Sequence, residues 1–462
     1  MNRPFARNIA VRRPSRGNGE RGFTLVELTV ALLAGLIVAM GIVSLSREAT
    51  NTFHEEARGS AAEAALRTAM DRLRADLQRA SYMSTGNILA DPSLAHAPGA
   101  TNIVTINSKM KGILGLGSIY LEPGGSITRN ANIKALSSKQ SPGVTPDFIR
   151  ISGNMSVADQ FDVAMIKQTN EADGCRRIYL TATAPALYRL LMSSDGGSAG
   201  ELNNVFMPST TAAQFIVRLV DNTGHSQFLA TCTDGPAGLD AANGNQPYVD
   251  IDYGNTPVIT ASQTGTMAGP NGYCSGKCWI NPVQIVQWEI IDAASEPAQD
   301  SWLARQSLSA TDANKFDLIR SYVDATGTVV PGTQEVVAEY AADLAFAFSV
   351  DKGTAALPAI STFAFDDATN NGPYAKSVAS VAANQGPQRI RVVRARLATR
   401  ASQADRTVLV SPPATSYTAQ NFLYRYCMVP AGCGAYDGTL KWARVRTLTA
   451  EVTLPNQSRN FY

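Results

Sequence analysis

One carboxylate, Glu27, stands inside a long apolar stretch near the start of the chain. From Phe23 to Leu45 it is the only charged side chain. An ionised carboxylate near the centre of a membrane helix costs roughly 2.5–3.5 kcal/mol, and such groups usually pair with a positive charge. We therefore expect Glu27 to meet a cation. The alternative is that its side chain, close to the end of the stretch, reaches the lipid headgroups by itself.

The stretch around Glu27 has the length of a membrane-spanning helix. At a rise of about 1.5 Å per residue, residues 23–45 extend roughly 35 Å, enough to cross the hydrocarbon core of a bilayer. The arginines before it predict a cytoplasmic N-terminus and place everything after Arg47 on the far side. A cleaved secretory signal is the alternative, but it has a shorter apolar region and no use for an acid within it. The sequence therefore favours a helix that is retained as a single-pass anchor.

Composition and charge narrow the class of protein. The chain has 462 residues, of which 45% are hydrophobic, so it can bury a large core. Six arginines against Glu20 give residues 1–22 a net charge of +5, and the overall charge of +2 therefore leaves −3 for the rest. A body of that charge has no basic surface of the kind that binds nucleic acid. We expect no DNA or RNA partner.

The residues Gly22-Phe23-Thr24-Leu25-Val26-Glu27-Leu28, between an Arg-rich leader and the apolar stretch, closely resemble the class III signal of type IV pilins and type II secretion pseudopilins. In that family a prepilin peptidase cuts after the glycine, on the cytoplasmic side, and methylates the new amino terminus. The resemblance implies cleavage between Gly22 and Phe23, N-methylation of Phe23, loss of the leader at residues 1–22 and retention of the helix. It also implies that Glu27 pairs with the terminal amine of a neighbouring subunit and sets the axial register of a helical filament.

The helical pattern continues beyond the membrane, and we expect an amphipathic second half of the helix over residues 46–83. Apolar residues recur there at spacings of three and four and predict a stripe that lies against a β-sheet: Leu66, Ala69, Met70, Leu73, Leu77 and Ala80. The charged residues between them are interpreted as a solvated face with partners one turn apart, such as Arg67 and Asp71. This set comprises Arg67, Asp71, Arg74, Asp76 and Arg79.

From residue 84 onward the pattern predicts a β-rich head, so we expect an α+β, type IV pilin-like fold with the long N-terminal helix packed on an antiparallel sheet. The expected strands are "FDVAMIKQ" (161–168), "RRIYLTATA" (176–184), "AQFIVRLV" (213–220), "VQIVQWEII" (283–291), "IRVVRARLATR" (390–400) and "RTLTAEVTLPN" (446–456). In the fifth, Arg394 and Arg396 are interpreted as a solvated face rather than a site for an acidic ligand.

The end of the chain refines the resemblance. Residues 335–460 are similar to the C-terminal region of PilW-type minor pilins, which are relatives of the J-type pseudopilins. Residues 85–330 have no counterpart that we recognise. We interpret the added length as large insertions in the head, which spans 84–462, and expect them to be exposed because loops tolerate added length.

Six cysteines follow the helix and would lie in the oxidising periplasm. Two local pairs, Cys274 with Cys278 and Cys427 with Cys433, leave Cys175 with Cys232 as a third expected disulfide. A zinc site is the alternative. No CxxC knuckle occurs and the three histidines are scattered, so we expect no metal and no cofactor.

Two further segments contain patterns that could carry chemistry. Residues 196–200 match the G-x-S-x-G motif of a hydrolase, but His225 is the only later histidine, and a flexible loop is the better interpretation. The segment "DDATNNG" (366–372) offers oxygen ligands for calcium, yet it is not an EF-hand pattern, and a plain turn is expected. The sequence predicts a protein that is not an enzyme.

The resemblance implies a minor pilin with a structural role in the priming or tip complex that initiates a type IV pilus. Its expected partners are a prepilin peptidase, other minor pilins, the major pilin and the inner-membrane assembly platform. It is expected in the inner membrane with the N-terminus cytoplasmic and the head periplasmic, and then in the pilus at the cell surface. The alternatives are a type II secretion pseudopilin and a pilin with an adhesive, ligand-binding head.

Overall fold

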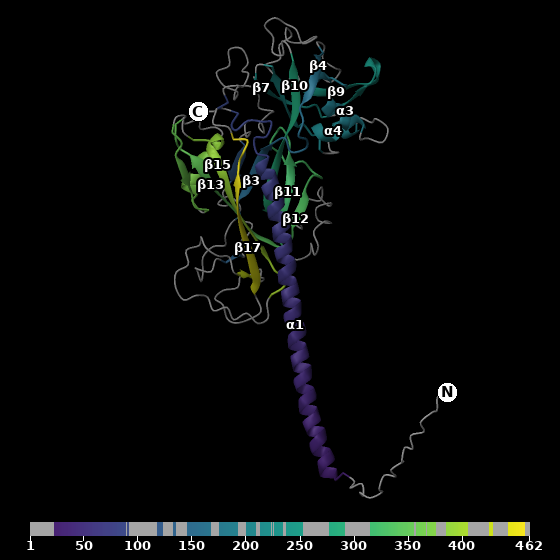
Figure 1. The fold of residues 1–462 in the computed structure, drawn as a ribbon, viewed down its shortest axis with the longest axis vertical. Helices are drawn as coiled ribbons and strands as arrows, with labels where there is room; N and C mark the ends of the chain where they lie inside the picture. Colours follow the sequence, from purple (N-terminus) through teal and green to yellow (C-terminus); the bar gives the residue numbers. More distant parts are fainter. Residues whose placement is uncertain are drawn as a thin grey trace, which may run out of the picture. The chain divides into compact units, whose positions relative to one another are not determined.

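The chain folds as an α+β protein with one long helix and antiparallel sheets, seen in a computed structural model (Figure 1). It divides into two compact units, residues 1–57 and residues 58–462. The residues that the structure describes are 23–88, 90–91, 118–122, 133–134, 146–167, 175–192, 200–208, 213–222, 224, 226–233, 237–252, 277–291, 315–354, 357–365, 367–375, 385–404, 425–427 and 442–457.

In the first unit, the described residues from Leu25 onward form the first part of helix α1 (Leu25–Gln78), which begins with the apolar stretch. Every residue from Phe23 to Thr50 is exposed. Among the described residues, α1 is the one helix long and apolar enough to cross a membrane, and its most apolar window is unburied. An apolar helix without a protein partner of its own is consistent with a single-pass membrane protein.

The second part of α1 packs into the head through the expected apolar stripe. Leu66, Ala69, Met70, Leu73, Leu77 and Ala80 are all buried, which confirms that prediction. The helix ends at Gln78, five residues before the expected boundary, in a turn where Ser81 and Met83 have positive φ angles of 62° and 50°. Such left-handed residues stop a helix because they redirect the chain.

The charged face of this part of α1 differs from the prediction at two points. Arg67 binds Glu63 at 2.6 Å, and Asp71 lies 3.7 Å from Arg74, so Arg67 and Asp71 do not pair with each other. Asp76 is buried rather than solvated. Its position three residues after Leu73 and four before Ala80 places it on the apolar stripe itself.

Two sheets and the stripe of α1 share one hydrophobic core, here called the helix-packed core. The first contribution comes from part of the eleven-stranded sheet, through β1 (Ile119–Glu122), β3 (Phe148–Gly153), β10 (Cys278–Ile291), β11 (Asp317–Val323) and β12 (Glu335–Ala338). The second comes from the six-stranded sheet, ordered β14 (Ile360–Thr362), β13 (Ala341–Asp351), β15 (Ile390–Arg400), β17 (Trp442–Thr453), β16 (Arg425–Cys427) and β2 (Ile133–Lys134).

The remaining strands of the larger sheet close into a ring, here called the barrel. Its neighbours in order are β10, β4 (Phe161–Ile166), β5 (Cys175–Leu180), β9 (Gln246–Asp252), β7 (Ser226–Ala230) and β6 (Ile216–Asp221), which returns to β10. A single bridge between Thr231 and Ile251 joins β7 to β9 and completes the ring. Strand β8 (Ala237–Asp240) pairs with β9 in an antiparallel hairpin, and η5 (Ala241–Asn243) connects the two.

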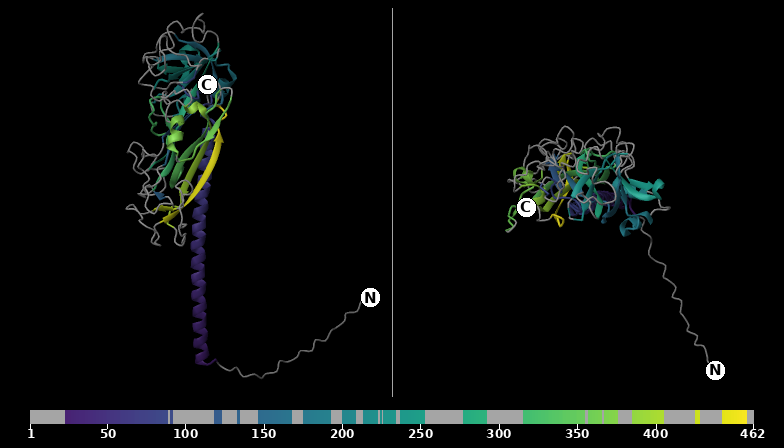
Figure 2. Two further views of the ribbon diagram at one scale, coloured as in Figure 1. Left: turned by 90° about the vertical axis from the view of Figure 1, so that its left-hand side faces the viewer. Right: turned by 90° about the horizontal axis from the view of Figure 1, so that it is seen from above.

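The barrel has a hydrophobic core of its own. Alternate residues of its strands line the inside, among them Leu219, Leu229 and Ile251, and helices α3 (Pro185–Met192) and α4 (Gly200–Phe206) add to the same cluster. Strand β10 serves both cores. Its first half pairs with β4 and β6, and its second half pairs with β3 and β11. Figure 1 and Figure 2 show the barrel strands (teal) gathered at one end of the head.

Strands occur within the described residues of the predicted insertions. Within the described residues between 85 and 330, β1, β3, β10 and β11 contribute to the helix-packed core, β2 pairs with β16 in the six-stranded sheet, and β4, β5, β6, β7 and β9 form the barrel together with β10. The six expected strands all occur, as β4, β5, β6, β10, β15 and β17. Long insertions become structured when they carry enough apolar residues to build a core, which the composition alone does not reveal.

The prediction that the arginines of β15 form a solvated face was partly wrong. Arg396 is buried and its Nε donates to Asp343 on the neighbouring strand at 2.8 Å. Arg394 is half-buried, and both guanidinium groups lie 5.0 Å from the ring of Phe365. The segment that carries Phe365 covers this face of the sheet, so the alternation of β15 predicted its strand but not the cover on its polar side.

Candidate functional site at the start of the membrane helix

The first turn of α1 holds the residues with the strongest sequence signal. Phe23 is 85% exposed, and Glu27 lies in the first turn. Glu27 Oε2 accepts hydrogen bonds from Thr24 N and Thr24 Oγ1, both at 3.0 Å, and Thr24 Oγ1 accepts one from Glu27 N at 3.2 Å. This reciprocal pattern is a capping box, which satisfies amide groups that a helix start leaves open. Gly22 lies outside the described residues.

The capping box was not anticipated, although its signature is present in the sequence. Thr24 followed three residues later by Glu27, directly before an apolar run, is the S/T-x-x-E pattern of a helix start. Both hydrogen bonds to the Glu27 carboxylate use Oε2. Oε1 keeps its lone pairs for another donor, since a carboxylate accepts at both oxygens. The local contact is therefore compatible with a further cation at the same side chain.

In the head, α1 is fixed to the sheet by a buried polar cluster. Asp76 Oδ2 accepts hydrogen bonds from Arg320 Nε on β11 at 2.8 Å and from Trp288 Nε1 on β10 at 2.9 Å. Burial acts to lower the pKa of Arg320, but the hydrogen bond and the charge of Asp76 outweigh it and hold that pKa above its ordinary value. The guanidinium therefore stays charged, and the cluster fixes the axial position of α1 against the sheet.

Side-chain amides close the far end of α1. Asn456 Nδ2 donates to the carbonyl groups of Gln78 at 2.9 Å and Ala80 at 3.3 Å. Asn281 Nδ2 donates to Met83 O at 2.8 Å, and Gln284 Nε2 donates to Val205 O at 3.0 Å. The last four carbonyl groups of a helix have no partner inside it, so bonds of this kind stabilise its end. Because Asn281 lies on β10, its amide joins the segment that follows α1 to this strand, while Gln284, also on β10, binds α4 instead.

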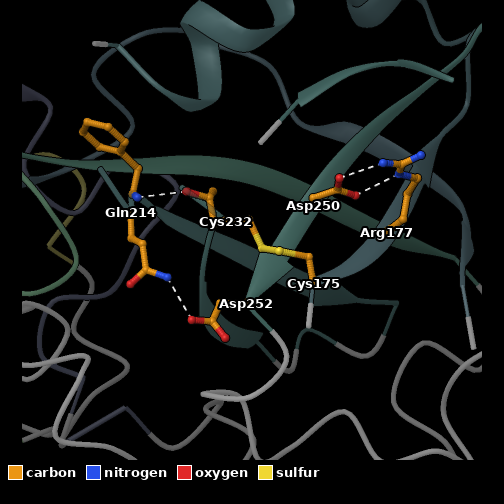
Figure 3. Close-up of a disulfide and its surroundings, with 8 residues drawn as sticks. Cys175, Arg177, Gln214, Cys232, Asp250 and Asp252 are labelled. Atoms are coloured by element: carbon orange, nitrogen blue, oxygen red, sulfur yellow. Dashed lines mark hydrogen bonds and ion pairs between the residues drawn. A yellow bond between two sulfur atoms is a disulfide. The ribbon is translucent and has the colours of Figure 1, made fainter. Parts of the chain in front are cut away.

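The disulfide between Cys175 and Cys232 lies beside the seam of the barrel (Figure 3). It is the one expected pair whose cysteines both fall within the described side chains. Near it, Cys232 N donates to Asp250 O at 3.0 Å, and Gln214 Nε2 donates to Asp252 at 2.8 Å. Cys278 is also disulfide-bonded. Cys274 and Cys433, the expected partners of Cys278 and Cys427, lie outside the described residues.

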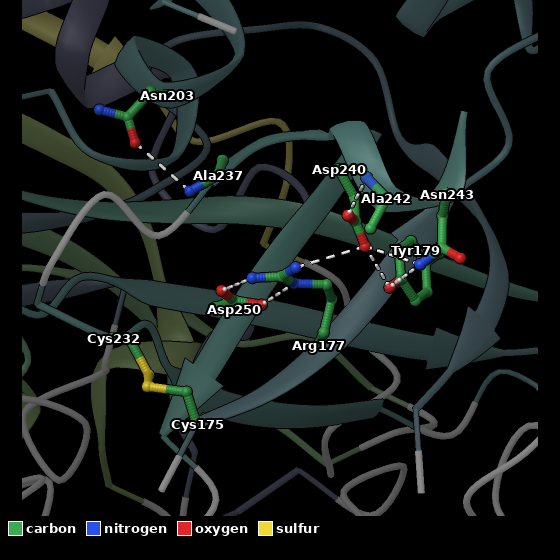
Figure 4. A network of polar contacts seen from close by, with 10 residues as sticks. All are labelled: Cys175, Arg177, Tyr179, Asn203, Cys232, Ala237, Asp240, Ala242, Asn243 and Asp250. Carbon is green, nitrogen blue, oxygen red and sulfur yellow. Dashed lines mark hydrogen bonds and ion pairs between the residues drawn. A yellow bond between two sulfur atoms is a disulfide. The ribbon is translucent and has the colours of Figure 1, made fainter. Parts of the chain in front are cut away.

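A second polar network holds the β8–β9 edge of the barrel (Figure 4). Arg177 forms two hydrogen bonds with Asp250, at 2.8 and 2.9 Å, and its guanidinium lies 3.7 Å from the ring centre of Tyr248. Tyr179 Oη donates to Asp240 at 2.6 Å and accepts from Asn243 at 2.8 Å.

The protonation of this network follows from its hydrogen bonds. The bond from Tyr179, together with that from Asn243, lowers the pKa of Asp240 to about 2. Burial, and then the hydrogen bond to Asp240 and the charge of Asp240, raise the pKa of Tyr179. The network is therefore an internally satisfied clamp, with Asp240 ionised and Tyr179 neutral at neutral pH.

The residues whose pattern suggested metal binding either form hydrogen bonds within the protein or lie outside the described residues. Within the described ranges, no group of three His, Cys, Asp or Glu side chains is arranged to hold a metal ion. Within the segment 366–372, residues 368–372 form the first part of a short helix, α6 (Ala368–Ala375), instead of a plain turn. There Asp367 Oδ1 accepts from Asn370 N at 3.0 Å, and Asn371 Oδ1 accepts from Phe348 N at 3.1 Å. Residues 196–199 and His225 are outside the described residues.

Comparison of the sequence with models of protein families, with curated proteins and with solved structures finds no match. The functional assignment therefore depends on the processing motif and on the geometry given above.

Proposed function

We propose that this protein is a minor pilin, with a structural and non-enzymatic role in the complex that starts a type IV pilus. The observation that carries the proposal is the combination at the start of α1: a glycine–phenylalanine junction, a capping-box glutamate four residues later, and an unburied apolar helix. The second half of that same helix packs into a β-rich head. A filament subunit needs both parts, because the apolar half associates with other subunits and the other half carries the head.

The proposed role of Glu27 is to pair, through Oε1, with the methylated terminal amine of Phe23 in a neighbouring subunit. The proposed partners are the prepilin peptidase, other minor pilins, the major pilin and the inner-membrane platform. In apolar surroundings such a pair is strong because the effective dielectric constant is low. Assembly, and not folding of the head, is the step that needs the charge.

The first experiment locates the mature N-terminus. Intact-mass and N-terminal peptide analysis of the full-length protein from membranes should find methylated Phe23 as the first residue. A mature terminus beyond Leu45 would mean a cleaved secretory signal and would end the pilin proposal. Retention of residues 1–22 would show that no peptidase of this type acts on the chain.

The second experiment isolates the charge of Glu27. In Glu27→Gln, the amide still accepts from Thr24, because glutamine also serves in a capping box. Only the ion pair is lost. We expect wild-type amounts of processed protein in the membrane and a marked fall in sheared pili. Glu48→Gln, on the same helix outside the apolar stretch, is the matched control and should not change recovery. Equal recovery of Glu27→Gln and wild type would show that the carboxylate only reaches the headgroups.

A further inference from the structure

Strand β17 leaves a long edge of the six-stranded sheet unpaired. It pairs with β16 over residues 442–444 and with β15 along most of its length, and among the described strands none lies along its other edge from Val445 to Thr453, here called the open edge. The open edge contains no proline or lysine, and its ladder with β15 has no bulge. Natural sheets usually protect an exposed edge by such features, because its free backbone groups pair readily with other strands. The open edge therefore indicates a partner strand.

The backbone groups that face the open edge belong to every second residue of β17. Leu454 N donates to Arg391 O and Ala401 N donates to Arg444 O, both at 2.9 Å, so the even-numbered residues of β17 bond to β15. In an antiparallel ladder the residues between them direct their N–H and C=O groups the other way. These outward-facing residues are Val445, Thr447, Thr449, Glu451 and Thr453. A row of alternating donors and acceptors of this kind is matched by another extended strand.

The opposite end of the same sheet has an edge that fits this row. Among the described strands, β14 pairs with β13 alone. Phe363 N donates to Phe348 O at 2.9 Å, so Ile360 and Thr362 direct their backbone groups away from β13. The antiparallel pairs from β14 through β13 and β15 to β17 show that β14 and β17 run in opposite directions. Two copies of the head that stand side by side in the same orientation can therefore join these edges as an antiparallel pair.

The direction of α1 favours this pairing over a symmetric one. Thr399, which lies opposite Arg446, donates to Ala62 O at 3.3 Å. Asn456, just beyond β17, donates to Gln78 O at 2.9 Å, so α1 and β17 run alongside each other in the same direction. Two antiparallel copies of β17, or of β14, would therefore point their α1 helices in opposite directions. Copies that are anchored through α1 in one membrane cannot adopt that arrangement, whereas pairing of β17 with β14 keeps both helices parallel.

We propose that the open edge of β17 pairs, antiparallel, with β14 of a second copy of this chain, so that the six-stranded sheet continues from one head to the next. The two edges differ, so the contact is head-to-tail and builds open rows instead of closed dimers. A ladder set by the three residues of β14 is weak by itself, but anchoring in one membrane raises the effective concentration of the partner. The proposal needs the membrane anchor and does not rest on the minor pilin proposal.

Cysteine crosslinking in membranes tests the contact and its phase. Two full-length forms with different tags are produced together, one with Thr362→Cys and the other with a single new cysteine between positions 447 and 452. No described cysteine is free to compete. After mild oxidation we expect crosslinks from odd positions such as Thr449→Cys and few from even ones such as Ala450→Cys. Thr362 and the odd positions share the face turned away from the helix-packed core, and neighbouring side chains point to opposite faces. Thr183→Cys, exposed in the barrel unit, is the matched control and should give none.

A proline in the open edge tests the backbone contact without disturbing the head. The N–H of Thr449 faces the open edge, so Thr449→Pro removes no bond to β15, and edge strands tolerate proline at such positions. We expect the crosslink between Thr447→Cys and Thr362→Cys to fall about fivefold or more, because the partner loses a backbone hydrogen bond. Protease resistance should stay unchanged. Leu448→Pro, which does remove a bond to β15, should reduce protease resistance instead.

Three results would overturn the pairing of β17 with β14. Crosslinks between two copies that both carry Thr449→Cys would show that the open edge meets itself. Equal yields from odd and even positions, or from Thr183→Cys, would show contact without a shared sheet. An unchanged yield in Thr449→Pro would show that the backbone of the open edge is not used. None of these results alters the mature N-terminus, so the minor pilin proposal is decided separately.

Discussion

The helix-packed core and the barrel are held together by different kinds of contact. The helix-packed core joins α1 to strands from two sheets. The polar contacts that hold it are buried, and the contact between Asp76 and Arg320 is central among them. The barrel is built from six strands, and its polar contacts lie at its edge, where Arg177 binds Asp250. A disulfide spans its seam. The helix-packed core unites distant parts of the chain, so we expect its stability to depend on the buried contacts between them. The barrel is closed at its seam by one backbone bridge, so we expect its stability to depend on the disulfide.

The largest effect is expected at Asp76. Asp76→Ala leaves the charge of Arg320 and the N–H of Trp288 buried without their acceptor, which destabilises a protein by about 3–5 kcal/mol. Denaturant unfolding of the full-length protein in detergent, followed with hydrogen exchange, should show the loss in α1, β10 and β11. Asp71→Ala, which removes an exposed partner of Arg74 on the same helix, should change stability by less than about 0.5 kcal/mol. Similar losses in the two variants would contradict the special place of Asp76.

The next effect should fall on the barrel alone. Replacing Cys175 and Cys232 by serine removes a link between residues 57 positions apart, and a bridge of that span contributes about 2–4 kcal/mol. We expect faster hydrogen exchange in β5, β7 and β9 and little change along α1. The distinction between the two regions fails if the helix-packed core loses protection to the same extent.

Much of the architecture follows from periodicity. The apolar stripe of α1 and the alternation of β15 and β17 predicted elements that the structure contains, because both periods are set by backbone geometry. The alternation of β17 holds for burial too, since Val452 is buried while Glu451 and Thr453 are exposed. The long apolar run likewise predicted the exposed first half of α1.

Periodicity did not predict the tertiary contacts between distant parts of the chain. A charged residue on an apolar stripe, such as Asp76, reads as solvated until its partner on β11 is known, and that partner is 244 positions away. Arg396 was assigned to solvent for the same reason. The strands β4, β5, β6 and β10 were predicted, but their closure into a barrel was not, because it depends on pairing between strands, such as β5 and β9, that are far apart in sequence. The Thr24–Glu27 cap, in contrast, is local and was readable from the sequence.

A smaller effect is expected from acid, again on the barrel. The pKa of Asp240 lies at about 2, below its ordinary value near 3.8, so ionised Asp240 stabilises the folded state. This contribution is complete above about pH 5 and is lost as the pH falls toward 2, because the unfolded chain binds the proton first. We expect a loss of about 1–2 kcal/mol in the β8–β9 region over that range. The same range should leave Asp240→Asn nearly unaffected, and an equal pH response in that variant would assign the effect to other carboxyl groups.

The smallest expected effect tests how the two regions are joined. Asn456→Ala removes the donor to the carbonyl groups of Gln78 and Ala80 at the end of α1, and the loss of hydrogen bonds of this kind costs about 1 kcal/mol. The nearby contact from Asn281 to Met83 remains, so the junction with β10 should hold. Hydrogen exchange should therefore quicken over the last turn of α1 and stay unchanged in β6 and β7. If the barrel strands also lose protection, the helix end and the barrel unfold together, and the two regions are one cooperative unit instead of two.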